Sequence, residues 1–386
     1  MSKPRKPRQP ASRQRATGFW QPELIGIVVL IAAMYLMPHV LVDDFLISKY
    51  SRYLVFGLLA MALSLSWGYG GILNLGQALP FGLGSYCMAM ALKLRTIPVQ
   101  TGAEGLPDFM VWNNVPQLPW FWAPFYSMTF AIVAGIVVPS ALMAALGWFM
   151  FRGRVTGVFV AITTLAMLVV VNLLIIDQQQ YTGGFNGITD LAQLTIGGIV
   201  FDAYNRTTFY LIASVASVAL LFGYVLSRTK FGLILQAIRD QEGRVQYFGY
   251  DVASYKITVM AISAAIAGLA GMLYTIVMEF ASPTFLNVPL SLSVVIWCAV
   301  GGRGSLPGAF FGAVLVTGVQ GALSESKTFL DTWTLVMGIL FVLVVLFLPS
   351  GLAGLISQLL VKIWPANGHH RNEAIDMKSN RPKEIA

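Results

Sequence analysis

The residue types that carry out covalent chemistry are scarce in this sequence. The three histidines are His39, His369 and His370, and no Ser/His/Asp or metal-ligand spacing joins them to other reactive groups. Cys87 and Cys298 lie inside apolar segments, so we expect small buried side chains rather than a disulfide or a metal site. The phosphate-binding pattern Gly-x-x-x-x-Gly-Lys-Ser/Thr does not occur. The sequence therefore predicts no catalytic residue, no metal, no cofactor and no nucleotide-hydrolysing site of its own.

Two similar glycine-rich breaks carry polar groups that could line a path for a solute. The first covers residues 68–85 and the second covers residues 301–312, and each separates two apolar segments with a Gly-Gly pair. Interrupted helices at matched positions of an internal repeat indicate a translocation path, because their freed backbone groups can line a polar cavity. Close helix packing through small residues is the alternative for either break taken alone. The expected path-lining residues are Asn74, Gly76, Gln77, Ser85, Gly301, Gly302 and Gly304.

Residues 231–249 have the pattern of an amphipathic helix, which we name the coupling helix. Leu235, Ile238, Val245 and Phe248 fall on one apolar face, and charged residues occupy the remainder. Such a helix either lies on a membrane surface or docks into a groove on a soluble partner and transmits its motion. The charged residues and the glycine expected at this docking site are Arg239, Asp240, Glu242, Arg244 and Gly249.

The ends of the coupling helix also carry recognisable signals. Gly249 is placed to end it in a left-handed C-cap, and Asp251 is placed to cap the following helix.

The composition places these features in a membrane protein. Of 386 residues, 56% are hydrophobic and only 11% are charged. A soluble domain of this size covers its surface with charge, whereas a bilayer penalises unpaired polar groups. The net charge of +8 is carried by the N-terminal tail and short loops rather than by one face, which argues against nucleic acid. We therefore predict an all-α fold, a polytopic transmembrane helical bundle.

About ten spans are expected, and the ones beside Gly71 and Gly302 are shorter than the roughly 20 residues that a full crossing needs. Loops 95–123 and 177–206 either receive a soluble partner or serve as connectors with aromatic anchors. The apolar segments are residues 24–42, 53–67, 77–92, 125–150, 155–176, 207–226, 257–278, 290–300, 305–323 and 332–348.

The distribution of Lys and Arg predicts the orientation. Most of them fall in regions that are cytoplasmic if the N-terminal tail is cytoplasmic, as the positive-inside rule expects. We therefore expect a multi-pass protein of the inner (plasma) membrane with a basic cytoplasmic tail (1–23), a transmembrane domain (24–348) and a cytoplasmic C-terminal tail (349–386). A signal peptide is disfavoured because the first apolar stretch is too long and lacks a small-residue cleavage site.

The expected spans are nearly free of ionisable residues. No Asp, Glu, Lys or Arg occurs in residues 53–92, 155–176 or 257–278. Ion-coupled pumps usually carry such a group at depth, so this absence argues against proton coupling and favours a neutral or zwitterionic substrate.

The motif Ala-Ile-Arg-Asp-Gln-Glu-Gly-Arg (237–244), continued to residue 251, and the segments 254–256 and 264–271 resemble permeases of branched-chain amino acid ABC importers, specifically their LivM-like half. Within that family, segments 295–308 and 346–351 are most similar to the UrtC-like permeases of urea ABC importers. The resemblance covers residues 53–355, but not the two tails or the tryptophan-rich loop.

This resemblance implies a heterodimer with a paralogous permease subunit, two cytoplasmic ATPase subunits and an extracytoplasmic substrate-binding protein. It implies a path for urea or a similar small neutral amide, and it places Arg239, Asp240, Glu242 and Gly249 at the ATPase interface. The alternatives are a branched-chain amino acid permease of the same family, a free-standing urea or amide channel, and an ion-coupled carrier.

Overall fold

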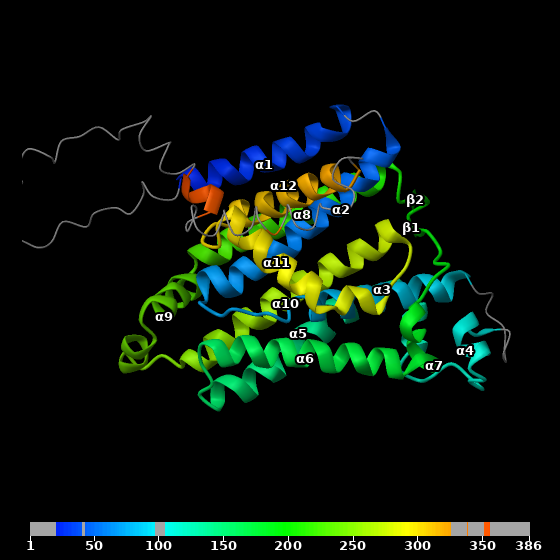
Figure 1. Ribbon diagram of the computed structural model, residues 1–386, viewed down its shortest axis with the longest axis horizontal. Coiled ribbons are helices and arrows are strands. Elements are labelled where there is room, and N and C mark those ends of the chain that lie inside the picture. Colours follow the sequence, from blue (N-terminus) through cyan, green and yellow to red (C-terminus); the bar gives the residue numbers. More distant parts are fainter. Residues whose placement is uncertain (1–20, 41–42, 97–104, 326–337, 339–350, 356–386) are drawn as a thin grey trace, which may run out of the picture.

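The computed structural model describes residues 21–40, 43–96, 105–325, 338 and 351–355. It is a bundle whose long helices run side by side along one direction (Figure 1). In these ranges, seven helical segments are long and apolar enough to cross a membrane, which confirms the predicted polytopic helical fold. They are α1 (Gln21–Val40), α2 (Asp44–Ser64) with its π-helical continuation η1 (Leu65–Tyr69), α5 (Met128–Arg152), α6 (Val158–Asp177), α8 (Arg206–Arg228), α10 (Val252–Met278) and α12 (Leu306–Glu325).

Two further predicted segments are helices that are not among these seven candidate spans. The segment 77–92 lies in α3 (Ala78–Thr96), and the segment 290–300 lies in α11 (Val288–Gly301), which has only 14 residues. The tenth segment, 332–348, lies outside the described residues apart from residue 338, and so do residues 1–20 of the basic tail and nearly all of the C-terminal tail.

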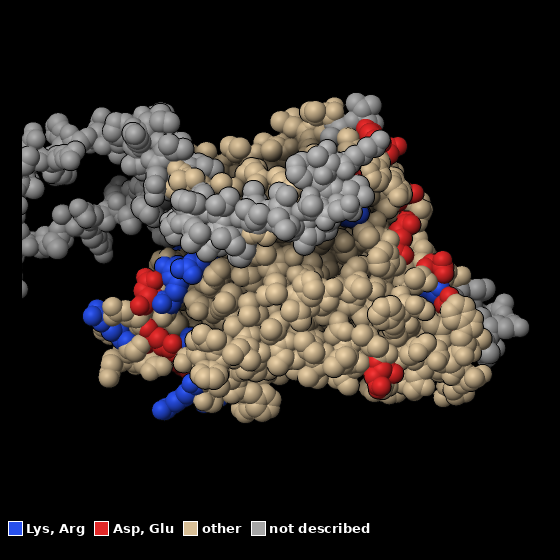
Figure 2. Space-filling view, viewed as in Figure 1, with Lys and Arg blue, Asp and Glu red and all other residues tan. Residues whose placement is uncertain are grey.

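Charged side chains gather at two opposite ends of the bundle, and a broad band without them lies between (Figure 2). One end carries α9 (Lys230–Tyr247), the helix found at the predicted coupling segment, and we call it the α9 end. The other end carries β1 (Leu194–Ile196) and β2 (Ile199–Phe201), and we call it the hairpin end. Such a band matches the hydrocarbon core of a bilayer, where unpaired charge is costly.

The hairpin end is more structured than the sequence indicated. β1 and β2 pair antiparallel with Ile196 opposite Ile199, a small sheet that the all-α prediction did not include. Gly197 and Gly198 both have positive φ between the strands, and two such residues are what a tight two-residue hairpin turn requires. The short helices at this end are α4 (Asp108–Trp112), η3 (Ala123–Tyr126), α7 (Gln179–Thr182), η4 (Gly184–Asn186) and η5 (Pro283–Leu286).

The core lies around α3, which packs against α5 and α10 and is buried along nearly its whole length. Small residues allow this close approach: a methyl group at Gly84 would overlap the carbonyl oxygen of Gly268, and one at Gly271 would overlap that of Phe81. Lipid supplies little hydrophobic drive between helices, so such packing stabilises the bundle through van der Waals contact. In contrast, α1 and α6 lie on opposite sides of the bundle (Figure 1), and most of their apolar side chains are partly or fully exposed.

Candidate functional site

The first glycine-rich break begins where α2 passes into η1. The Gly71 amide donates to the Trp67 carbonyl (3.1 Å), and Gly71 then takes a φ of +69° that ends the helix. Residues 72–77 run without regular structure into the start of α3 at Ala78. The break predicted from the Gly-Gly pair is therefore present, and it lies at the α9 end of α2.

Two buried amides hold residues 72–77 in place. Asn74 donates from Nδ2 to Oε1 of Gln77 (2.7 Å), and its Oδ1 accepts from the amide of Gly76 (2.9 Å). Gln77 in turn donates from Nε2 to Oγ of Ser263 on α10 (3.1 Å). The side chains of Asn74 and Gln77 are almost fully buried, so in this conformation their polar groups are bonded to protein partners.

Hydroxyl groups of two further helices also bind the backbone of this segment and of the first residue of α3. The amide of Leu75 donates to Oγ1 of Thr164 on α6 (3.1 Å), and the amide of Ala78 donates to Oγ of Ser291 on α11 (3.3 Å). Segment 72–77 is thus clamped between α6, α10 and α11. Ser85, another predicted path residue, lies farther along α3 and shares a hydrogen bond of 2.7 Å with Thr275 of α10 in the buried interior.

The second break is a tight turn between α11 and α12. Gly301 ends α11, and Gly302 has a φ of +109° and donates its amide to the Cys298 carbonyl (3.0 Å). Gly301 packs against Gly308 and Gly312 of α12, whereas a methyl group at Gly304 would meet open space. The correspondence of the two breaks through an internal repeat stays a prediction.

The two breaks touch each other. Ser64 donates from Oγ to the carbonyl oxygen of Arg303 (2.8 Å), and the Arg303 guanidinium lies over the ring of Trp67, 5.4 Å from its centroid. A methyl group at Gly68 would overlap the same Arg303 carbonyl, so only glycine fits there. The similar glycine-rich patterns indicated both breaks, but they could not indicate this contact, because the contact joins residues more than 230 positions apart.

The coupling helix is present as α9, with one correction. Leu235, Ile238 and Val245 are buried as predicted, but Phe248 is 81% exposed. The helix is kinked at Gln241 (φ −153°, ψ 84°) and ends at Tyr247, so Phe248 lies at the C-cap position rather than on the buried helical face. Gly249 has the left-handed φ of +84° expected just after the helix end.

The predicted docking residues of α9 divide into two groups. Arg239 donates from Nη1 to the carbonyl oxygen of Gly68 (2.6 Å), and Glu242 pairs with Lys256 of α10 (2.7 Å), so both contact the chain's own membrane helices. Asp240, Arg244 and Gly249 are exposed, and 38% of the Arg239 side chain is exposed beside its contact with Gly68. The outward surface of α9 therefore consists of part of the predicted set, joined by the exposed Tyr247 and Phe248.

Asp251 stands at the predicted N-cap position of α10, but its side chain makes no capping hydrogen bond there. Its carboxylate accepts from the hydroxyl of Ser254 (2.6 Å) and lies 3.5 Å from the Arg152 guanidinium. These contacts, the Ser254 hydroxyl first, lower the pKa of the Asp251 carboxyl below its usual range.

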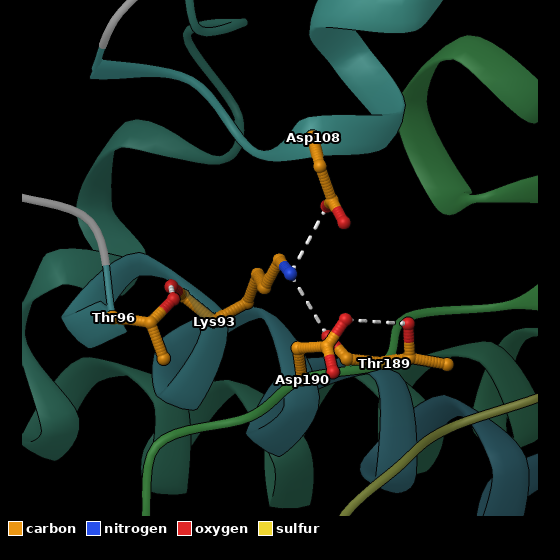
Figure 3. A network of polar contacts seen from close by, with 5 residues as sticks. All are labelled: Lys93, Thr96, Asp108, Thr189 and Asp190. Carbon is orange, nitrogen blue, oxygen red and sulfur yellow. Dashed lines mark hydrogen bonds and ion pairs between the residues drawn. The ribbon is translucent and has the colours of Figure 1, made fainter.

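The hairpin end holds a buried cation, Lys93, just past the end of the predicted apolar segment 77–92. Lys93 reaches Asp108 of α4 (3.0 Å) and donates to the Thr189 carbonyl (3.0 Å), while only 6% of its side chain is exposed (Figure 3). It thereby fastens two loops that are far apart in the sequence. A lysine near a helix end gives no sequence signal that distinguishes this role from an exposed one.

Comparison with known proteins agrees with this architecture. The family described as "Branched-chain amino acid transport system / permease component" matches residues 47–345. A probable branched-chain amino acid transport permease protein LivM from Methanocaldococcus jannaschii is 27% identical over 76% of this chain and 89% of its own length. The high-affinity branched-chain amino acid permease LivM of Salmonella typhimurium is 27% identical over 82% of this chain and 72% of its own length. The ribose import permease RbsC of Haemophilus influenzae is 25% identical over 50% of this chain and 61% of its own length. No solved structure matches the chain.

Proposed function

The chain belongs to the family of permease components of branched-chain amino acid ABC transporters, and we propose that it forms one half of the substrate path of an ATP-driven importer. A related permease subunit supplies the other half. Two ATPase subunits bind at the α9 end, and a substrate-binding protein delivers the solute at the hairpin end. The observation that carries this proposal is the placement of the outward-facing coupling helix directly against the first glycine-rich break.

The exposed end of α9 supports the docking of an ATPase. Tyr247 and Phe248 are 93% and 81% exposed, next to Arg244 on the same helix. Exposed aromatic side chains beside a charge are typical of the anchoring residues of protein interfaces. The orientation that follows has the α9 end in the cytoplasm, with both tails (1–23 and 349–386) on that side and the inner membrane as the location.

Two substrate classes have separate support. The names of the curated relatives favour branched-chain amino acids, whereas the resemblance of segments 295–308 and 346–351 favours urea or a similar small amide. The buried side chains that hold residues 72–77 include amides and a hydroxyl, those of Asn74, Gln77 and Ser263. Such groups donate and accept hydrogen bonds without adding charge, as recognition of an uncharged or zwitterionic solute requires.

The decisive experiment is uptake into proteoliposomes that hold the chain with its permease, ATPase and binding-protein partners. Labelled leucine and labelled urea are supplied separately, with ATP or a non-hydrolysable analogue inside the vesicles. We expect ATP-dependent uptake of one of the two. Uptake by vesicles that hold this chain alone would instead show a free-standing channel. Loss of uptake on adding an uncoupler at constant ATP would show an ion-coupled carrier.

A further inference from the structure

Arg239 lies on the coupling helix, yet its side chain reaches into the membrane domain. Its Nη1 is 2.6 Å from the carbonyl oxygen of Gly68, and its Nε pairs with Asp240 (3.0 Å). The Gly68 carbonyl belongs to the π-helical turn that ends α2. A carbonyl near a helix end has no partner in the next turn, so an arginine donor there satisfies it.

The aliphatic part of the Arg239 side chain also packs closely against the backbone of Gly71. A methyl group at Gly71 would lie 3.0 Å from Cγ and 3.3 Å from Cβ of Arg239. The backbone of the break therefore packs directly on the stem of this arginine. The contact joins α9 to the break by packing as well as by a hydrogen bond.

Gly68 extends the contact to the second break. The Cα of Gly68 packs against the carbonyl oxygen of Arg303, and the carbonyl oxygen of Gly68 accepts a hydrogen bond from the Arg239 guanidinium. Arg303 is held in addition by Ser64 and lies over Trp67. A displacement of α9 thus has one short route into both breaks, through Arg239, Gly68 and the Arg303 backbone.

We propose that Arg239 is the positioning residue that transmits movement of the coupling helix to the two glycine-rich breaks. The inference rests on the proposed transport function and adds to it a specific connection inside this chain. In this role Arg239 keeps α9 and residues 65–71 together as one moving unit. An arginine that only stabilised the fold would affect assembly and ATP hydrolysis as much as uptake, whereas a transmitting arginine affects chiefly the uptake obtained per ATP hydrolysed.

The test compares Arg239→Gln and Arg239→Lys in the complete reconstituted complex, measuring ATP hydrolysis and substrate uptake in the same vesicles. We expect Arg239→Gln to keep its ATPase partners and their hydrolysis, but to lose uptake per ATP by about tenfold or more, the effect of one lost hydrogen bond to a charged group. Arg239→Lys should restore part of the loss, because it keeps a cationic donor. The matched control is Arg154→Gln, an exposed arginine at the same end in the α5–α6 connection.

Uptake per ATP at the parent level in Arg239→Gln would overturn the inference. A parent complex that showed no ATP-dependent uptake would instead refute the proposed function, so the two failures are distinguishable.

Arg239→Lys covers the case in which Arg239→Gln does not assemble, because it keeps a cationic donor on α9 but loses the fork of the guanidinium. In that case we expect the assembled Arg239→Lys complex to hydrolyse ATP at the parent rate and to take up less substrate per ATP than the parent complex. Parent-level uptake per ATP in Arg239→Lys would then overturn the inference.

Discussion

The carboxylate of Glu242 on α9 lies 2.7 Å from the ammonium group of Lys256, whose side chain is only 9% exposed at the start of α10. Lys256 also lies over the ring of Phe151, with its Nζ 5.5 Å from the ring centroid. The second half of the coupling helix is therefore anchored to a buried cation, and Val245 beside it is buried as well. Together with Arg239, this pair gives α9 two separate points of attachment to the membrane domain.

Glu242→Gln should lower the stability of the chain, because it leaves Lys256 largely buried without its counter-charge. We expect a loss of about 1–2 kcal/mol, measured by thermal unfolding in detergent micelles. Asp240→Asn is the matched control, since Asp240 is 65% exposed and its loss should cost less than about 0.5 kcal/mol. Equal melting temperatures for the two variants would contradict this assignment.

The exposed aromatic pair should matter for assembly rather than for folding. Tyr247→Ser combined with Phe248→Ser is expected to abolish co-purification of the ATPase subunits while leaving the melting temperature of the isolated chain unchanged. Trp112→Ser at the hairpin end removes a similarly exposed aromatic side chain and should leave co-purification intact. Retention of the ATPases by the double variant would argue against this docking surface.

Replacing Glu242 and Arg244 together should abolish uptake while leaving membrane insertion intact. Arg244 is exposed and available to a partner, and Glu242 fixes the half of α9 that presents it. Uptake in vesicles and the amount of inserted chain are measured side by side. Normal uptake by this variant would remove the docking interpretation of α9.

Lys93→Met should loosen the hairpin end. The substitution leaves Asp108 without its ion-pair partner and the Thr189 carbonyl without its donor, which should cost about 2 kcal/mol. Limited proteolysis of loops 105–123 and 178–205 in intact vesicles should then become faster. Arg95→Met, an exposed cation two residues away on the same helix, is the control and should not change the cleavage rate.

The acid Glu279, at the C-cap of α10, should make stability depend on pH. Partial burial raises the pKa of its carboxyl above the usual range, and the nearby Asp202 carboxylate adds to the shift, while a hydrogen bond from Gln193 opposes it. A raised folded-state pKa means that the folded chain binds this proton more tightly than the unfolded chain, so stability falls as pH rises through that pKa. Glu279→Gln should flatten this part of the profile of melting temperature against pH; parallel profiles would contradict the assignment.

Much of the fold was predictable because the bilayer leaves a strong signal in the sequence. Apolar segments of about 20 residues predicted the long helices, and the Gly-Gly pairs marked both breaks correctly. The coupling helix was placed within one or two residues of its observed bounds. These successes depend on local pattern, which needs no knowledge of neighbours in space.

The parts that were missed depend on long-range contact or on local distortion. The partner of Arg239 is 171 residues away, so no spacing rule could indicate it. Phe248 was assigned to the buried face because a straight helix to residue 249 was assumed, whereas α9 is kinked at Gln241 and ends at Tyr247. Asn74 and Gln77 were expected to line the path, and that role stays a prediction. The hydrogen bond between their side chains could not be foreseen from the sequence.

Both cysteines of the chain are buried, Cys87 in α3 and Cys298 in α11. Thiol reagents added to the folded protein should therefore react very little with these two native cysteines. A single cysteine introduced at Tyr247 would carry a fluorophore or spin label on the coupling helix, and a second near Trp112 would report on the opposite side. The natural chain is thus suited to distance measurements during turnover without first removing its own sulfhydryl groups.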